Sequence, residues 1–175
     1  VTVRPGTVFT YCDLNSDILA GVVETVAGMP LLDYANHVLF GPLGITNYSW
    51  VSDQNGLPFG SMGLYLTPHD MARLGYLYLH HGEWAGEQVV SSEWIDTVTC
   101  LDPEVCPFDD LSAGVLGYGY HWWLFKPHFY SAQGMAGQYI AVAPAYDLVV
   151  VITSSGNTLD QSYGTIPFQL LNQLI

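Results

Sequence analysis

The spacing of hydrophobic residues changes near residue 115, and this change constrains the fold more than any other feature of the sequence. Before it, apolar residues recur at helical spacing and are interrupted by glycine and proline. After it, segments typical of strands follow one another with short turns between them. Because short connections join antiparallel neighbours, we predict an α+β fold, an antiparallel sheet with helices packed on it.

The first 100 residues are expected to be mainly helical. Helices are predicted over residues 16–27 (ended by Gly28), over residues 31–39, from Thr67 as N-cap to Gly82, and from Ser91 or Ser92 to Val98. In the first of these, apolar residues from Ile18 to Val26 share one face. Residues 47–63 are expected to form an irregular loop.

Strands are expected over the range 115–155. The predicted strands are 118–125, 129–133, 138–143 and 148–154, with turns at Lys126-Pro127, Gly134–Gly137 and Pro144–Asp147. A closing helix over residues 165–175 is expected to pack on this sheet. We therefore interpret residues 1–175 as one portion of a single domain.

Charge and hydropathy exclude several classes of partner. The 16 acidic and 3 basic residues give a net charge of −13, which repels nucleic-acid phosphates and anionic lipid. We expect no nucleic-acid or membrane partner, since no apolar run approaches the roughly 20 residues that span a bilayer. Half of the residues are hydrophobic, which is typical of a globular chain. If the chain is a fragment, an exposed apolar patch should face the missing part.

The cysteines bear on metal binding and on compartment. Cys100 and Cys106 flank a turn-rich segment that could bring them together, and such a bridge would suggest an oxidising compartment, periplasmic or secreted. No cluster of cysteine and histidine has the spacing of a zinc site, so we expect no metal.

Several motifs together resemble a known family. They are Pro5-Gly6-Thr7-x-Phe9-x-Tyr11-Cys12-Asp13-Leu14-Asn15, Gly63-Leu64-Tyr65-Leu66-Thr67-Pro68-x-Asp70-Met71-Ala72, Glu93-Trp94, Tyr118-Gly119-Tyr120-x-Trp122-Trp123 and Gly137-Gln138-Tyr139-Ile140. The chain resembles the C-terminal half of the serine β-lactamase-like superfamily, and within it class C-type β-lactamases, esterases and 6-aminohexanoate-dimer hydrolases. The resemblance implies the C-terminal half of a β-lactamase/transpeptidase-like fold.

In that family, a serine one helical turn before a lysine attacks an ester or amide, and a tyrosine shares the proton transfer. The resemblance places this catalytic tyrosine at Tyr11, with Asp13 where the family usually has asparagine. Asp13 is either a substrate-binding carboxylate or a helix-capping residue. The only lysine is Lys126, and Trp123 stands three positions before it, so the sequence contains no Ser-x-x-Lys motif.

The family's third motif, Lys-Thr-Gly, corresponds to Ala132-Gln133-Gly134. The resemblance implies that Gln133 and Gly134 bind substrate and that a backbone N–H in residues 133–137 completes an oxyanion hole. Trp122 and Trp123 alternate across a strand, so one is expected in the core and Trp123 could line the substrate cleft.

Two functions from different classes follow. The first is the C-terminal part of a serine hydrolase that cleaves small-molecule esters or amides through an acyl-enzyme, with the nucleophile in an N-terminal half that this sequence lacks. The alternative is a catalytically inactive fragment or binding module that keeps the pocket. Neither implies a metal or an organic cofactor.

Overall fold

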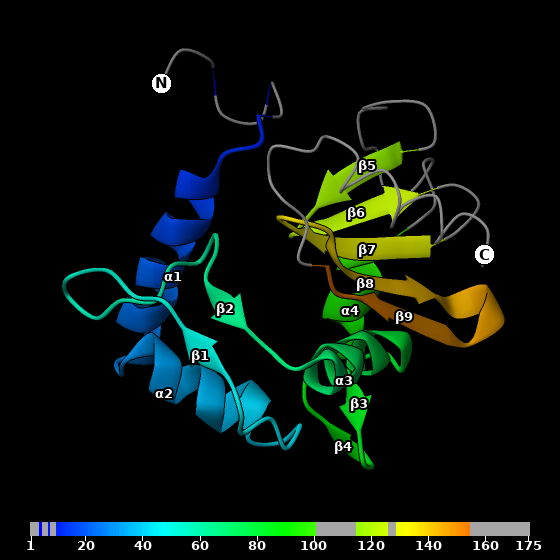
Figure 1. Ribbon diagram of the computed structural model, residues 1–175, viewed down its shortest axis with the longest axis horizontal. Helices are drawn as coiled ribbons and strands as arrows, with labels where there is room; N and C mark the ends of the chain where they lie inside the picture. The colour runs from blue at the N-terminus through cyan, green and yellow to red at the C-terminus, as the bar shows by residue number, and fades with distance from the viewer. Residues whose placement is uncertain (1–3, 5–6, 8–9, 101–114, 126–128, 155–175) are drawn as a thin grey trace. The chain divides into compact units, whose positions relative to one another are not determined.

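The computed structural model describes residues 4, 7, 10–100, 115–125 and 129–154 (Figure 1). The chain divides into two compact units, residues 1–67 and 68–175. Unit 1 contains α1 (Asp13–Ala27), α2 (Leu31–Ala35), a π-helical turn (Asn36–Phe40), β1 (Ser49–Trp50) and β2 (Leu64–Tyr65). Unit 2 contains α3 (Pro68–Leu79), β3 (Glu83–Trp84), β4 (Glu87–Gln88), α4 (Ser92–Val98), β5 (Val115–Gly119), β6 (Trp122–Phe125), β7 (Phe129–Gly134), β8 (Gln138–Ala143) and β9 (Leu148–Ile152).

The helices of unit 1 end where glycine allows it. Gly28 follows α1 with φ of 66°, and its N–H donates to the Glu24 carbonyl, which is a left-handed C-cap. The predicted helix over 31–39 is instead two pieces, because α2 passes into the π-helical turn. There the Gly41 N–H donates to the Asn36 carbonyl, and a Cβ at Gly41 would lie 2.6 Å from that oxygen. Only glycine can close this wider turn.

A small core holds unit 1 together. Its buried apolar side chains are Ala20, Leu31, Ala35, Phe40, Leu43 and Ile45. The ring of Phe40 lies 4.7 Å from that of Tyr48 and 6.2 Å from that of Trp50. The segment predicted as an irregular loop therefore contains order that its sequence did not indicate, since Ser49–Trp50 pairs antiparallel with Leu64–Tyr65.

Unit 2 is a five-stranded antiparallel sheet in the order β5-β6-β7-β8-β9, which confirms the predicted fold class. The prediction of one strand over 118–125 was wrong, because β5 and β6 are separate strands joined at Tyr120 and His121. Both residues have positive φ, 53° and 74°, as a two-residue hairpin turn requires. Such turns usually contain asparagine or glycine at these positions, so the residue types did not indicate a turn.

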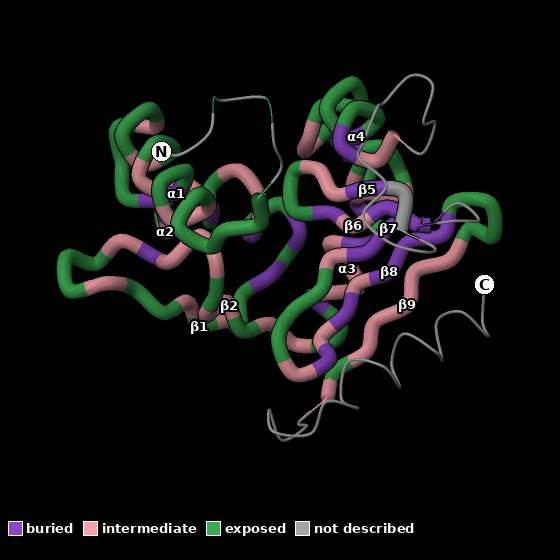
Figure 2. Tube along the Cα trace, turned by 90° about the horizontal axis from the view of Figure 1, so that it is seen from above, coloured by how far each residue is buried: buried purple, intermediate pink, exposed green. Residues whose placement is uncertain are grey.

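Helices α3 and α4 cover one face of this sheet. A buried cluster on that face joins Val98 of α4 to Trp122, Leu124, Tyr130 and Val142, with Tyr78 and Leu79 of α3 packed against it. Gly75 lets α3 approach closely, since a Cβ there would lie 2.5 Å from Val149 Cγ1. The opposite face carries a second cluster around Phe125, Phe129, Tyr139, Ala141 and Ala143. Both faces of the sheet are therefore buried (Figure 2).

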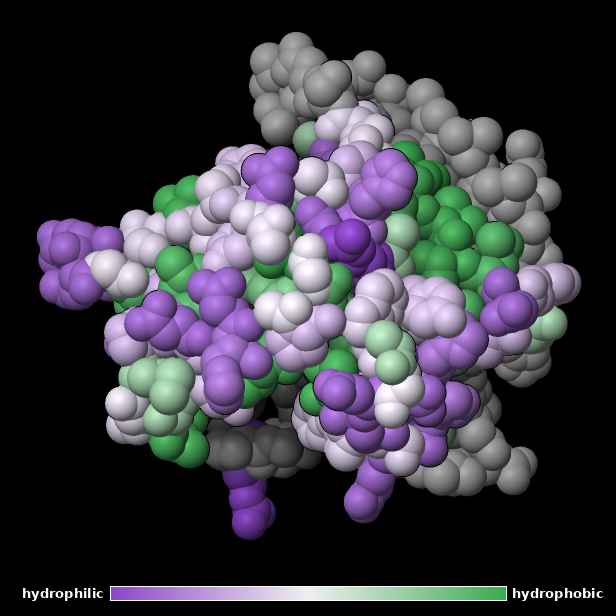
Figure 3. Space-filling model, turned by 90° about the horizontal axis from the view of Figure 1, so that it is seen from below, coloured by the Kyte–Doolittle hydropathy of each residue, from purple (hydrophilic) through white to green (hydrophobic). Residues whose placement is uncertain are grey.

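Other predictions meet the structure in part. Ser91 is the N-cap of α4, because its hydroxyl accepts the Trp94 N–H. The predicted closing helix and the turn at Lys126-Pro127 lie outside the described residues. Among the described helices none alone is long and apolar enough to cross a membrane; α1 and the run Leu31–Phe40, bent by 78°, reach that length and composition only together. Hydrophobic residues nevertheless reach the surface in patches between hydrophilic ones (Figure 3).

Candidate active site

Tyr11 lies on the extended segment that leads into α1. Its side chain is 57% exposed. Cys12 is the N-cap residue, with extended φ and no side-chain capping hydrogen bond, so Asp13 is the first helical residue and not the cap. An exposed carboxylate at this position interacts favourably with the positive end of the helix. The structure thus presents a phenol and a carboxylate, two residues apart, at the start of α1.

A loop fixes the helix that follows Tyr11. The backbone N–H and the hydroxyl of Ser61 both donate to Asp17 Oδ1, at 3.1 and 2.8 Å. Gly60 permits this approach, because a Cβ there would lie 2.1 Å from the Ser16 carbonyl oxygen. The sequence did not predict this contact, and its only signal was a pair of small residues within a glycine-rich loop.

Gln133 and Gly134 lie at the exposed end of β7. They pair with Tyr139 and Gln138 of β8, and the Gln133 Nε2 donates to the Ser131 hydroxyl at 3.0 Å. The turn to β8 then passes through Ala136 and Gly137, both with positive φ. A neutral amide at Gln133 can hydrogen-bond a substrate, but it cannot form an ion pair with a substrate carboxylate.

The two neighbouring tryptophans face opposite sides of the sheet. Trp122 is buried under α3, with its ring 4.5 Å from that of Tyr78, which confirms that one of the pair is a core residue. Trp123 lies on the other face, 4.7 Å from the ring of Tyr118 and packed against the second cluster. Its Cα partner on β7 is Ser131, the residue that Gln133 contacts. Trp123 is therefore linked to Gln133 through Ser131.

Two other tyrosines are unsuited to accept a proton. Burial raises the pKa of Tyr78, and burial together with the neighbouring Tyr78 phenol raises the pKa of Tyr130 still further. Both phenols therefore stay protonated at neutral pH. They belong to the packing of α3 on the sheet and not to a proton-transfer site.

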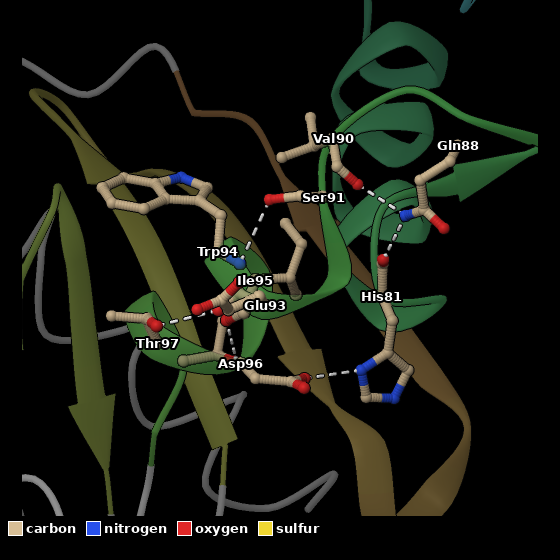
Figure 4. A network of polar contacts seen from close by, with 10 residues as sticks. His81, Gln88, Val90, Ser91, Glu93, Trp94, Ile95, Asp96 and Thr97 are labelled. Carbon is tan, nitrogen blue, oxygen red and sulfur yellow. Dashed lines mark hydrogen bonds and ion pairs between the residues drawn. The ribbon is translucent and has the colours of Figure 1, made fainter.

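A polar network joins the end of α3 to α4 (Figure 4). His81 Nδ1 lies 2.8 Å from Asp96 Oδ1, and the side-chain amide of Gln88 donates to the carbonyls of His81 and Val90. His81 has φ of 50°, a strained value for a non-glycine residue. This histidine–aspartate pair was not predicted from the sequence. Near it, an open pocket of about 680 Å³ lies between α3, the β3–β4 hairpin and the β8–β9 turn, and none of the predicted site residues lines it.

The structure thus brings together two groups of predicted site residues, Tyr11 with Asp13 in unit 1 and Gln133, Gly134 and Trp123 in unit 2. Their assignment to catalysis and substrate binding stays a prediction. Within the described ranges, no group of three or more His, Cys, Asp or Glu is arranged to hold a metal ion. Cys12 is a free thiol and Cys100 is disulfide-bonded; its predicted partner Cys106 lies outside the described residues.

Comparison with known proteins gives the family. Residues 2–173 match the family model described as Beta-lactamase. A curated 6-aminohexanoate-dimer hydrolase from Paenarthrobacter ureafaciens is 31% identical over 153 residues, which cover 84% of this chain and 39% of that protein. This chain therefore spans about two fifths of that relative's length.

Solved structures agree with this match. A putative 6-aminohexanoate-dimer hydrolase from Bacillus anthracis superposes with a TM-score of 0.81 at 26% identity, over 99% of this chain and 46% of that one. The penicillin-binding protein homologue from Pyrococcus abyssi has the same fold, with a TM-score of 0.70 at 20% identity over 98% of this chain and 44% of its own. The chain belongs to the β-lactamase family, as its motifs indicated.

Proposed function

We propose that this chain is the C-terminal part of a serine hydrolase that cleaves esters or amides through an acyl-enzyme. The observation that carries the proposal is the position of Tyr11, exposed on the segment directly before α1 in a chain of the β-lactamase family. Tyr11 matches the family's proton-transferring tyrosine. The serine nucleophile and its lysine would come from the polypeptide that the relatives carry outside the matched part.

The chemistry of Tyr11 explains why this chain would be inactive by itself. A phenol has an ordinary pKa near 10, so it accepts a proton at neutral pH only where a nearby cation stabilises its anion. The lysine of a Ser-x-x-Lys motif would be that cation, and the sequence does not contain the motif. Acyl-enzyme formation also needs an activated nucleophile. Tyr11 would then hand the proton to the leaving group.

The substrate class follows from the other residues. The curated relative is a 6-aminohexanoate-dimer hydrolase, and a dimer of an amino acid is joined by an amide. Gln133 would hydrogen-bond the substrate without a formal charge, and Gly134 leaves the strand end open. The net charge of −13 disfavours anionic substrates. We therefore favour an uncharged ester or an amide over a carboxylate-bearing β-lactam.

The test compares the isolated chain with a completed enzyme, in which this chain is joined to the unmatched part of the Paenarthrobacter ureafaciens relative. The isolated chain should hydrolyse a short-chain p-nitrophenyl ester no faster than buffer, and the completed enzyme should turn it over. In the completed enzyme, Tyr11→Phe should lower kcat by about 10² to 10⁴, the usual effect of a lost general acid–base group. A completed enzyme without activity would favour the inactive binding module.

A further inference from the structure

Helix α1 presents its apolar side to solvent and its small and polar side to its own unit. The apolar side, which we term the outer face of α1, consists of Leu14, Ile18, Leu19, Val22, Val23 and Val26, with exposed fractions from 38% to 82%. The residues that are covered are Ser16, Asp17, Ala20, Gly21, Glu24 and Ala27. In a surface helix the apolar stripe normally faces the core, so this arrangement is inverted.

The inner side is held in place by specific contacts. Asp17 accepts two hydrogen bonds from Ser61, and the Glu24 carboxylate accepts the Leu31 N–H at the start of α2, at 2.9 Å. Gly60 approaches the Ser16 carbonyl too closely for any side chain. Turning the outer face inward would break these hydrogen bonds and bury valine and leucine against a backbone that has no room for them. The outer face is therefore a stable surface of unit 1.

A lipid surface or a second copy of the chain fits this face poorly. The net charge of −13 repels anionic membranes. A specific protein dimer buries about 800 Å² on each partner, more than two crossing helices of this length would cover with one stripe each. The relatives, by contrast, contain more than twice the polypeptide of this chain within the same family of fold.

We propose that the outer face of α1 is the surface on which the remaining polypeptide of the β-lactamase-family domain packs, and that this contact attaches the nucleophile-bearing part to Tyr11. The inference rests on the proposed function, and it names the partner of that site. Tyr11 stands three residues before Leu14, the first residue of the outer face. A polypeptide that covers this face must therefore pass close to the Tyr11 phenol.

Thiol labelling tests the contact without requiring turnover. Cys12→Ser removes the free thiol, and Ile18→Cys and Val22→Cys then report on the outer face, with Glu87→Cys on exposed β4 as the matched control. In the isolated chain all three engineered positions should react rapidly. In the completed enzyme the two positions on α1 should react at least about tenfold more slowly, because reaction would require local opening. The control rate should be unchanged.

Polar substitutions give an independent reading. Ile18→Gln, Val22→Gln and Val26→Gln together should reduce the binding of an apolar dye by the isolated chain, yet lower the melting temperature of the completed enzyme. Asn15→Gln, on the same exposed side of α1, should do neither. Slow labelling in the isolated chain, or no protection in the completed enzyme, would overturn the proposal.

Other occupants have their own signatures. Protection that grows with the concentration of the isolated chain would assign the outer face to a second copy, and protection by phosphatidylcholine vesicles alone would assign it to lipid. Either result overturns the proposal. Protection without ester hydrolysis would support the contact and refute the proposed function, whereas hydrolysis without protection would do the reverse.

Discussion

The two units use hydrophobic residues in opposite ways. In unit 2, apolar side chains on both faces of the sheet are almost completely buried, and Leu124 and Val142 have no exposed surface. In unit 1, helix α1 buries Ala20 and leaves Val26 82% exposed (Figure 2). The sheet unit is finished as a packed core, whereas α1 is built as one side of an interface. Helical periodicity alone does not say which side of a helix its own chain covers.

The largest expected effect contrasts these two environments. Leu124→Ala should lower the free energy of unfolding by about 2–5 kcal/mol, because it removes buried methyl groups and leaves a cavity between the sheet and α4. Val26→Ala should change it by less than about 0.5 kcal/mol, as expected for an exposed position. Urea unfolding of the isolated chain, followed by circular dichroism, measures both. Equal losses for the two variants would show that α1 is packed within this chain, and the contrast between the units would then disappear.

The second prediction assigns substrate recognition to unit 2. In the completed enzyme, Gln133→Lys should raise kcat/KM for a chromogenic cephalosporin, relative to a p-nitrophenyl ester, by roughly 10- to 150-fold, since a charge-assisted hydrogen bond contributes about 1.5–3 kcal/mol. Gln138→Lys, at the paired position on β8, serves as the control and should not reproduce this change. If the wild type already prefers the cephalosporin, or if the ratio does not move, the third motif is misplaced at Gln133.

The third prediction concerns the clasp that holds α1. Gly60→Ala should lower the free energy of unfolding by about 1–3 kcal/mol, because the new methyl group meets the Ser16 carbonyl and the backbone must move. Gly21→Ala, inside α1, has ordinary space around its new Cβ and should stabilise by about 0.5–1 kcal/mol. The same urea experiment decides this pair, and a neutral Gly60→Ala would mean that the loop does not fix α1.

The smallest effect is a pH dependence in unit 1. The backbone N–H groups of Leu57 and Asn55 donate to Asp53 and lower its pKa below the ordinary range. A carboxylate with a lowered pKa adds stability above its unfolded pKa, and this contribution is lost as the pH falls through the folded value. Titration of Asp53 by NMR should show the lowered pKa, with loop 53–57 loosening only in acid. An ordinary pKa would contradict the loop geometry.

Regular elements with local signals were the part of the fold that could be predicted from the sequence. The strand over 138–143 and the helix that starts at Pro68 follow directly from alternation and from a threonine–proline start. The turn at Tyr120 and His121 could not be predicted, because neither residue is typical of positive φ. Its geometry is imposed by the pairing of β5 with β6.

The candidate site shows the same division. Motif resemblance identified Tyr11 and the end of β7 without any structure. The Ser61–Asp17 contact joins residues 44 positions apart, and the His81–Asp96 pair joins residues 15 apart, so neither is encoded in local spacing. The inverted exposure of α1 was equally invisible, since its cause is a set of polar contacts on the opposite side of the helix.

The central claim is that this chain contributes the proton-transferring tyrosine and the substrate strand, but not the nucleophile. Treatment with an alkyl fluorophosphonate, which modifies activated serines, followed by intact-protein and peptide mass spectrometry, tests it most directly. We predict no adduct on the isolated 175-residue chain and one adduct in the completed enzyme, on a serine outside these residues. An adduct on any serine of this chain, Ser61 and Ser131 included, would contradict the claim.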